Sequence, residues 1–312
     1  MLPKAGIQIS RKAAYTGHTG SVFSLIRDVR NPGVFYSAGG DQRIIQWDTR
    51  KPSTGSRIGV GSGTIFALLS LPGEQLAIGQ MNGILSLFTP GSENLKTLLP
   101  ATGYSIFDLL CYDNRMIAAH GNGRLTIWNL EDEALLQTIQ LSDKSIRQMS
   151  LHPEGRLLAA GVSDNTIYLI ETENYTVVRK LNGHQNSVFA VCFSPDGNYL
   201  LSGSRDAQVK IWDARNNYTL VHSIPAHMFT VNSIACSPDG RYFATGSRDH
   251  SIRIWDAQSF ALLKVIDREK YVGHTHSVNR ILWLEEDNLL ISTGDDRKIM
   301  VWEIKTAREE LE

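Results

Sequence analysis

The sequence predicts an all-β protein built from seven repeats of one four-stranded unit, and three observations support this. First, one set of residue types recurs at a fixed spacing along the chain. Second, the segments between these residues look like short strands separated by turns. Third, seven copies of the unit, spaced 40 to 47 residues apart, use the whole 312-residue chain. We therefore expect a single domain over residues 1–312.

The recurring set consists of a His, a Ser or Thr, an Asp and a Trp. In four copies the Trp follows the His by 28 or 29 residues, the Asp lies six residues before the Trp, and the Ser or Thr lies ten before it. Four copies that keep three spacings are a specific signal of internal repetition. The complete copies are His18, Ser37, Asp41 and Trp47; His184, Ser202, Asp206 and Trp212; His227, Thr245, Asp249 and Trp255; and His274, Ser292, Asp296 and Trp302.

Three weaker copies fit between the first and second complete ones, so the seven units end near residues 47, 88, 128, 170, 212, 255 and 302. These three units are inferred from their spacing, and we expect their loops to differ from the rest. Their four positions read Gly61, Ile78, Asn82 and Phe88; Thr102, Ala118, Asn122 and Trp128; and Ser142, Ala160, Asp164 and Ile170.

Within a unit the local pattern predicts strands. Residues 187–193 are apolar and β-prone, and they end at the turn sequence Ser-Pro-Asp-Gly of residues 194–197, which recurs at 237–240. Residues 199–202, 209–212 and 219–224 predict three further strands before the next His. A helical periodicity of useful length is absent from the sequence, so we expect four antiparallel strands per unit.

These motifs resemble the WD-repeat family of β-propellers over essentially the whole chain. The resemblance implies a seven-bladed β-propeller whose blades are four-stranded antiparallel sheets. It also implies that each His, Ser or Thr, Asp and Trp set is a structural tetrad, a buried hydrogen-bonded network that links the loops of a blade to its sheet. In the family, the outer strand of the last blade comes from the N-terminus. We expect residues 6–10 to supply that strand and to close the ring.

Composition limits the classes of partner and location. The chain carries 31 Lys and Arg against 32 Asp and Glu, which gives no reason to expect a nucleic-acid or membrane partner. The three cysteines show no metal or disulfide spacing, which suits a reducing compartment. Neither a signal peptide nor an apolar run long enough to span a bilayer is evident. We expect a cytoplasmic protein, and the sequence leaves its oligomeric state open.

The tetrads also resemble a catalytic arrangement, because His, Ser and Asp together can activate a nucleophile. The same set occurs four times, always tied to a Trp, whereas a catalytic trio is needed once. We therefore expect no catalytic residue and no enzyme. His276 lies two residues after His274 and could pair with it on a metal, but a third ligand is not evident, so we expect neither metal nor cofactor. The remaining histidines are expected to be solvated or locally bonded: His120, His152, His222 and His250.

The resemblance places a partner on the narrower top face, around the mouth of the central channel. Five positions after the His or its equivalent stand Phe23, Phe66, Phe107, Arg147, Phe189, Asn232 and Asn279. One position before the Asp stand Arg205 and Arg248, a pair suited to a carboxylate or phosphate. Aromatic residues and Arg dominate binding hot spots. Two interpretations of the Phe residues stay open, namely exposure to a partner and packing against the next blade.

The sequence thus predicts a non-catalytic protein-interaction scaffold or adaptor. Its top face would bind peptides or proteins with acidic and apolar features. The alternative is a propeller enzyme or small-ligand binder that uses the mouth of the channel, which would need carboxylates, histidines or metal ligands to converge there. An insertion at residues 267–270, before the seventh unit, either shapes binding or is surface variation.

Overall fold

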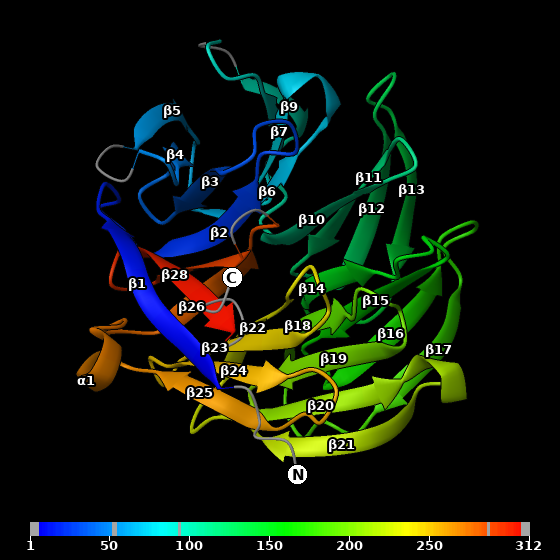
Figure 1. The fold of residues 1–312 in the computed structure, drawn as a ribbon. Helices are drawn as coiled ribbons and strands as arrows, with labels where there is room; N and C mark the ends of the chain where they lie inside the picture. The colour runs from blue at the N-terminus through cyan, green and yellow to red at the C-terminus, as the bar shows by residue number, and fades with distance from the viewer. Residues whose placement is uncertain (1–5, 52–54, 93–94, 286–287, 307–312) are drawn as a thin grey trace.

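The computed structural model describes residues 6–51, 55–92, 95–285 and 288–306. In this part of the chain the strands form seven four-stranded antiparallel sheets. Figure 1 shows the sheets arranged as blades around a common centre. The expected seven-bladed, all-β architecture is therefore confirmed. Residues 1–5 and 307–312, which the single-domain expectation also covers, lie outside the described residues.

Six blades consist of four consecutive strands, named here from the centre outward. Blades one to three are β2 (Val22–Arg27), β3 (Val34–Gly39), β4 (Arg43–Asp48) and β5 (Ser56–Val60); β6 (Ile65–Ser70), β7 (Leu76–Gln80), β8 (Leu85–Phe88) and β9 (Leu95–Leu99); and β10 (Ile106–Tyr112), β11 (Arg115–His120), β12 (Arg124–Asn129) and β13 (Leu135–Gln140).

Blades four to six are β14 (Ile146–Leu151), β15 (Leu157–Val162), β16 (Thr166–Glu171) and β17 (Val177–Asn182); β18 (Val188–Phe193), β19 (Tyr199–Ser204), β20 (Gln208–Asp213) and β21 (Thr219–Pro225); and β22 (Val231–Cys236), β23 (Tyr242–Ser247), β24 (Ile252–Asp256) and β25 (Leu262–Ile266). Blade seven is β26 (Val278–Trp283), β27 (Leu289–Gly294), β28 (Ile299–Thr306) and β1 (Ile7–Tyr15).

The outer strand of blade seven comes from the beginning of the chain. Strand β1 pairs antiparallel with β28, with Ile7 opposite Thr306 and Tyr15 opposite Ile299 (Figure 1). This confirms that an N-terminal strand closes the ring. The strand is longer than the expected residues 6–10, because the polar residues 11–12 continue the pairing through a bulge between Arg11 and Ala13. Polar residues on an outer strand give no alternating apolar signal, so its length could not be predicted.

The core lies between neighbouring blades. The cluster between blades five and six, for example, joins Leu201 and Ile211 of one blade to Ile234, Phe243 and Trp255 of the next. Each sheet packs on both faces, which explains why second strands such as β3, β23 and β27 are buried along their whole length. The inner strand β2 packs against both β6 and β26, so the ring is continuous.

Helices contribute little. The insertion before blade seven forms a short helix, α1 (Arg268–Tyr271), whose first turn is capped by the Asp267 side chain accepting from the Lys270 N–H. Two 3-10 turns, η1 (Pro72–Glu74) and η2 (Ala214–Asn216), complete the elements. Within the described ranges, no helix has the length and apolar character that a membrane span requires.

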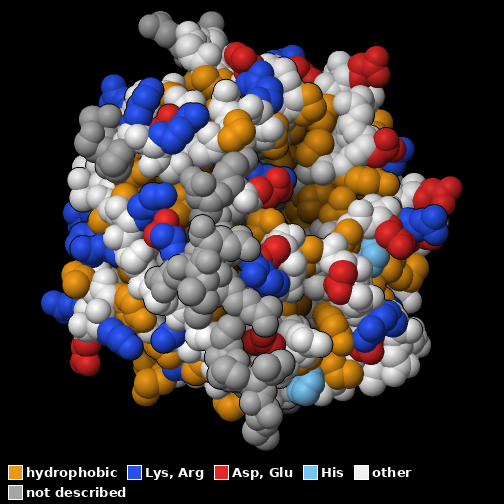
Figure 2. All heavy atoms as spheres, in the orientation of Figure 1, with side chains coloured by type: hydrophobic (Ala, Val, Ile, Leu, Met, Phe, Trp, Pro, Cys, Tyr) orange, Lys and Arg blue, Asp and Glu red, His pale blue; other side chains and the backbone are white. Residues whose placement is uncertain are grey.

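The face shown in Figure 2 carries Lys and Arg side chains interspersed with Asp and Glu, with hydrophobic side chains gathered around a hollow near the middle. A single sign of charge does not dominate this face, which matches the balanced totals of the sequence.

Candidate functional site

Each complete tetrad forms one chain of hydrogen bonds. In blade one, His18 Nδ1 lies 3.0 Å from Asp41, His18 Nε2 lies 2.7 Å from Ser37 Oγ, and the Trp47 indole N–H donates to Ser37 Oγ over 2.7 Å. The tetrads of blades five, six and seven repeat this arrangement with the same three distances between 2.8 and 3.0 Å. Each Asp also accepts the backbone N–H that follows the His, as Asp41 does from Thr19. The carboxylate thus links the loop before a blade to the turn between its second and third strands.

A neutral imidazole satisfies every member of a tetrad. Its Nδ1–H donates to the Asp, its Nε2 accepts the Ser or Thr O–H, and that oxygen accepts the indole N–H. In agreement, burial lowers the pKa of His18 and His227, even though Asp41 and Asp249 oppose this. Burial opposes ionisation of Asp206, but hydrogen bonds from His184 and the Gln185 N–H hold its pKa at about 2. The tetrads of blades one and six therefore hold a neutral His beside a carboxylate.

The Ser–His–Asp geometry of a tetrad matches that of a hydrolytic triad, but its hydroxyl is inaccessible. Ser37, Ser202, Thr245 and Ser292 are fully buried, and each hydroxyl is already engaged by an indole. A substrate carbonyl could not reach these oxygens without unfolding the blade. Each tetrad instead holds the loop before its blade against the sheet through hydrogen bonds.

The weaker blades use other polar contacts at the same place. In blade four, Ser142 and Tyr168 both donate to Asp164, over 2.7 and 2.8 Å. In blade two, the buried Gln80 accepts from the N–H and hydroxyl of Ser62. Each loop is therefore still tied to its sheet, although the tetrad residues are missing.

Blade three replaces the tetrad with residues that motif counting did not identify. His120 Nε2 lies 2.9 Å from Thr126 Oγ1, which also accepts the Trp128 indole N–H over 3.0 Å. His120 is buried, so of the two expected environments it has the locally bonded one. The signal in the sequence was a Thr two positions before the Trp, on the same strand.

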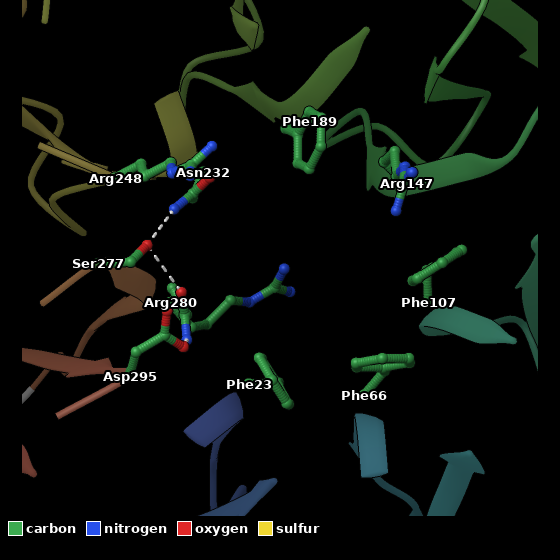
Figure 3. Close-up of a pocket in the computed structure, with 11 residues that line it drawn as sticks. Phe23, Phe66, Phe107, Arg147, Phe189, Asn232, Arg248, Ser277, Arg280 and Asp295 are labelled. Carbon is green, nitrogen blue, oxygen red and sulfur yellow. Dashed lines mark hydrogen bonds between the residues drawn. The ribbon is translucent and has the colours of Figure 1, made fainter. Parts of the chain in front are cut away.

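The seven positions counted five after the His converge on one cavity at the centre of the top face, which we define as the face carrying the loops that precede the inner strands. The cavity has a volume of about 460 Å³ and draws residues from every blade (Figure 3). Among the candidate residues, those that line it are Phe23, Phe66, Phe107, Arg147, Phe189, Asn232, Asn279 and Arg248; Arg205 is exposed and lies outside the lining.

Blades one to five contribute an aromatic arc. The Phe23 and Phe66 rings meet edge to face with centroids 5.1 Å apart, and Phe66 stacks on Phe107 at 5.3 Å. The Arg147 guanidinium continues the arc, 4.4 Å from the Phe107 centroid and 4.9 Å from that of Phe189. Each of these side chains is half-buried, so it packs against the next blade and also faces the cavity. The Phe residues therefore contact neighbouring side chains along the arc and line the cavity at the same time, and their role in binding a partner stays a prediction.

Blades six and seven contribute a polar arc. Asn232 donates to Ser277 over 2.9 Å, Ser277 donates to Asn279 over 3.0 Å, and Asn279 donates to Asp295 over 2.7 Å. Figure 3 shows this chain on the side of the cavity opposite Phe66 and Phe107. The cavity therefore has one apolar wall and one wall that exchanges hydrogen bonds.

A cation that motif counting missed occupies the middle of the cavity. Arg280 extends into it from β26 and places Nη2 3.4 Å from Asp108 Oδ1 of blade three, across the channel. Burial raises the pKa of Asp108, against the opposing charge of Arg280. The sequence did hold a sign of this ion pair, one position after the counted set in each blade. One acid and one base stand there among seven residues, which are Ser24, Ala67, Asp108, Gln148, Ala190, Ser233 and Arg280.

Cations outnumber carboxylates around the mouth. Arg147, Arg248 and Arg280 line it, and among the described lining residues only Asp295 carries a carboxylate. Burial and the neighbouring charge of Arg205 lower the pKa of Arg147. The mouth therefore favours a negatively charged group. Within the described part of the chain, no three His, Cys, Asp or Glu side chains are grouped so as to hold a metal ion.

The loops of the same face expose further large apolar side chains, of which only Met81 stands at a counted position, one before the Asp equivalent Asn82. Met228 and Phe229 follow the His of blade six and are 78% and 56% exposed. Met81 and Tyr104, on the loops of blades two and three, are 55% and 52% exposed. In the sequence, the apolar pair directly after His227 could have indicated this exposed surface.

Family models match the chain from blade three onward. The model described as "WD domain, G-beta repeat" matches residues 175–213, 218–256 and 267–303. A second model, "Anaphase-promoting complex subunit 4 WD40 domain", matches residues 110–191.

Curated relatives and a solved structure agree with these matches. "WD repeat-containing protein 36" from Homo sapiens is 32% identical over 101 residues, which cover 32% of this chain and 11% of that protein. "Striatin homolog" from Dictyostelium discoideum is 26% identical over 234 residues, which cover 63% of this chain and 28% of that protein. The match to this chain therefore spans well under a third of these relatives' own length.

The crystal structure of the WD40 β-propeller domain of Doa1 superposes with a TM-score of 0.82 at 18% identity, and the match covers 96% of this chain and 97% of that one. At this identity the likeness shows the fold alone. Fold and repeat spacing agree over the whole described ring, and the family models match it between residues 110 and 303. The chain belongs to the WD-repeat family of β-propellers.

Proposed function

We propose that this protein is a non-catalytic interaction scaffold whose top face binds peptide or protein segments that combine apolar and acidic side chains. The fold is typical of protein-interaction scaffolds. The observation that carries the finer proposal is the top-face cavity, where an aromatic arc and three Arg side chains meet in one concave site. An apolar side chain would pack on Phe66 while a carboxylate next to it pairs with Arg248.

The exposed apolar residues around the cavity support a protein partner over a small molecule. Met228 and Phe229 lie on one side of the ring, and Met81 and Tyr104 lie on blades two and three. Exposed apolar area of this kind marks interaction surfaces, and a partner would bury it together with the cavity. The three cysteines are all free, which suits a reducing compartment, so we propose that the scaffold works in the cytoplasm.

An array of peptides that pair aromatic or aliphatic residues with Asp or Glu tests the proposal. We expect the native protein to bind a subset of these peptides, and the Arg205→Glu, Arg248→Glu double variant to bind them at least about tenfold more weakly. Phe66→Ala should weaken the same peptides, because it removes the middle of the aromatic arc. Binding should also weaken as salt is added.

The matched control is Arg156→Glu, Arg241→Glu, which reverses two exposed charges on the loops of the opposite face. It should bind like the native protein. Melting temperatures near the native value would show that all variants are folded. If the top-face variants retain full affinity while folded, the partner surface lies elsewhere and the proposal is wrong.

A further inference from the structure

Two cysteines meet where the inner strands of blades five and six end. Cys192 lies on β18, two residues before the turn that begins at Ser194, and Cys236 lies on β22, one residue before the equivalent turn at Ser237. Successive side chains of a strand point to opposite faces of its sheet. The offset of one residue therefore lets Cys192 face blade six and Cys236 face blade five. Their Sγ atoms lie 3.6 Å apart across the interface.

One member of the pair, Cys236, borders a second cavity, at the opposite end of the channel from the top face. This cavity of about 830 Å³ is lined by Cys236, by Pro195 and Pro238 of the two turns, and by apolar residues such as Leu282 and Trp283. Both thiols also pack against the apolar cluster between blades five and six, yet they stay partly exposed. A small reagent in the cavity can therefore reach Cys236, and Cys192, whose Sγ lies 3.6 Å away, is itself partly exposed.

The surroundings make one thiol of the pair more acidic than the other. The hydrogen bond with Cys236 and the positive charge of Arg280 lower the pKa of Cys192. The same hydrogen bond and burial raise the pKa of Cys236. A nucleophilic thiolate beside a second thiol is the arrangement that thiol–disulfide exchange requires.

We propose that Cys192 and Cys236 form a dithiol site that low-molecular-weight disulfides oxidise to a disulfide bond between blades five and six. The Cys192 thiolate attacks one sulfur of the small disulfide, whose S–S bond breaks and releases one thiolate, which takes up a proton. Cys236 then loses its proton and its sulfur attacks Cys192 Sγ in the mixed disulfide. This forms the Cys192–Cys236 bond and releases the second small thiol. Two protein thiols are oxidised and one small disulfide is reduced to two thiols.

The geometry requires only a short movement. The two Sγ atoms must approach by about 1.5 Å to reach the ~2.05 Å of a disulfide bond. The bond would link residues 44 positions apart and so would constrain the unfolded chain. Oxidation should therefore raise the melting temperature. This inference does not rest on the proposed top-face function, because the two cysteines lie at the other end of the channel.

Glutathione disulfide serves as the probe, applied to the folded full-length protein without reductant. The reaction is quenched with acid, and free thiols are then alkylated. We expect a mass lower by two hydrogens, a Cys192–Cys236 cross-linked peptide, and alkylation of Cys111 alone. Cys111 is the matched control, since it is partly exposed on β10 but packs against the cluster between blades two and three. The melting temperature should rise by several degrees and return when dithiothreitol is added.

The variants separate the two steps. Cys111→Ser should oxidise like the native protein, whereas Cys236→Ser should stop at a glutathione adduct on Cys192, and Cys192→Ser should form no cross-link. If the native protein keeps three alkylatable thiols, or accumulates only glutathione adducts, the proposal is overturned. Since the peptide map is made on the native protein, a variant that fails to fold does not affect this decision.

Discussion

A single buried hydroxyl holds two other groups in each complete tetrad. Ser202 Oγ accepts the Trp212 indole N–H over 2.9 Å and lies 2.8 Å from His184 Nε2, and all three side chains are buried. Removing the oxygen leaves an N–H and an imidazole nitrogen buried without a partner. Burying a polar group without a partner costs more free energy than a hydrogen bond contributes to stability.

Ser202→Ala should therefore lower the free energy of unfolding by about 2–6 kcal/mol, at about 1–3 kcal/mol for each of the two groups left unpaired. Chemical denaturation measures this. The matched control is Ala160→Ser at the equivalent position of blade four, where Ile170 replaces the indole. This added hydroxyl should not stabilise the protein, because no indole donates to it. A Ser202→Ala variant as stable as the native protein would show that the tetrad contributes nothing.

For single residues, the sequence predicted those whose contact recurs in several blades better than those whose contact occurs once. Tetrad positions follow from the fixed spacing, since four copies constrain one another. His120 with Thr126, and Arg280 with Asp108, each occur once, so repetition gave no information about them. The cavity-lining Phe residues could be counted from the motif, but their stacking depends on the angle between blades, which spacing alone does not give.

Among the elements, strand β1 contacts several separate parts of the fold. It covers the outer edge of β28, and its first and last residues, Ile7 and Tyr15, are buried in two different interblade clusters. Arg11 also donates to the Val272 carbonyl, next to α1, over 2.8 Å. The strand therefore closes a blade and contacts the insertion at the same time.

Deleting residues 1–12 should lower the melting temperature markedly, because β28 would become an unpaired edge from Trp302 to Thr306 and the contacts of Ile7 would be lost. Differential scanning calorimetry measures the change. Ile7→Ala is the milder version and should cost about 2–4 kcal/mol. Ser10→Ala, at an exposed position of the same strand, is the control and should have little effect. An unchanged melt after the deletion would contradict closure by this strand.

The existence of the strands was predictable, whereas their ends were less so. Turn sequences such as residues 194–197 fixed where inner strands stop, because Pro and Gly restrict the backbone there. The continuation of β1 beyond residue 10 and helix α1 were harder, because residues 11–12 and most of residues 268–271 are polar and show no period. Their conformations depend on partners far away in sequence, such as β28 and Arg11.

For the molecule as a whole, the tetrads make stability depend on pH in one direction. Burial lowers the pKa of His18 and His227 below the ordinary 6.5, and the pKa values of Asp41, Asp249 and Asp296 are also lowered. In each case the unfolded chain binds the proton at a higher pH than the folded chain does. Stability is therefore greatest above these ordinary values and is lost as the pH falls.

We expect the melting temperature to fall as the pH drops below about 6.5, where His18 and His227 of the unfolded chain become protonated, and to fall further below about 4, where its carboxylates do. Calorimetry over a pH series checks this. Asp206→Asn should flatten the lower part of the curve, since that carboxyl has a pKa of about 2 when folded, against an ordinary value of 3.8. A flat curve between about pH 7 and pH 5 would show that folding does not lower the pKa of these imidazoles.

The pairing of β1 with β28 also has a consequence for synthesis on the ribosome. The partner of β1 emerges roughly 290 residues later, about 15 to 60 s at common elongation rates of about 5–20 residues per second. During that time the first strand has no sheet to join, although six other blades can form from neighbouring strands. The nascent chain therefore exposes an unpaired β-prone segment until β28 has been synthesised, and during this time the segment is most open to capture by a chaperone or to pairing with another nascent copy.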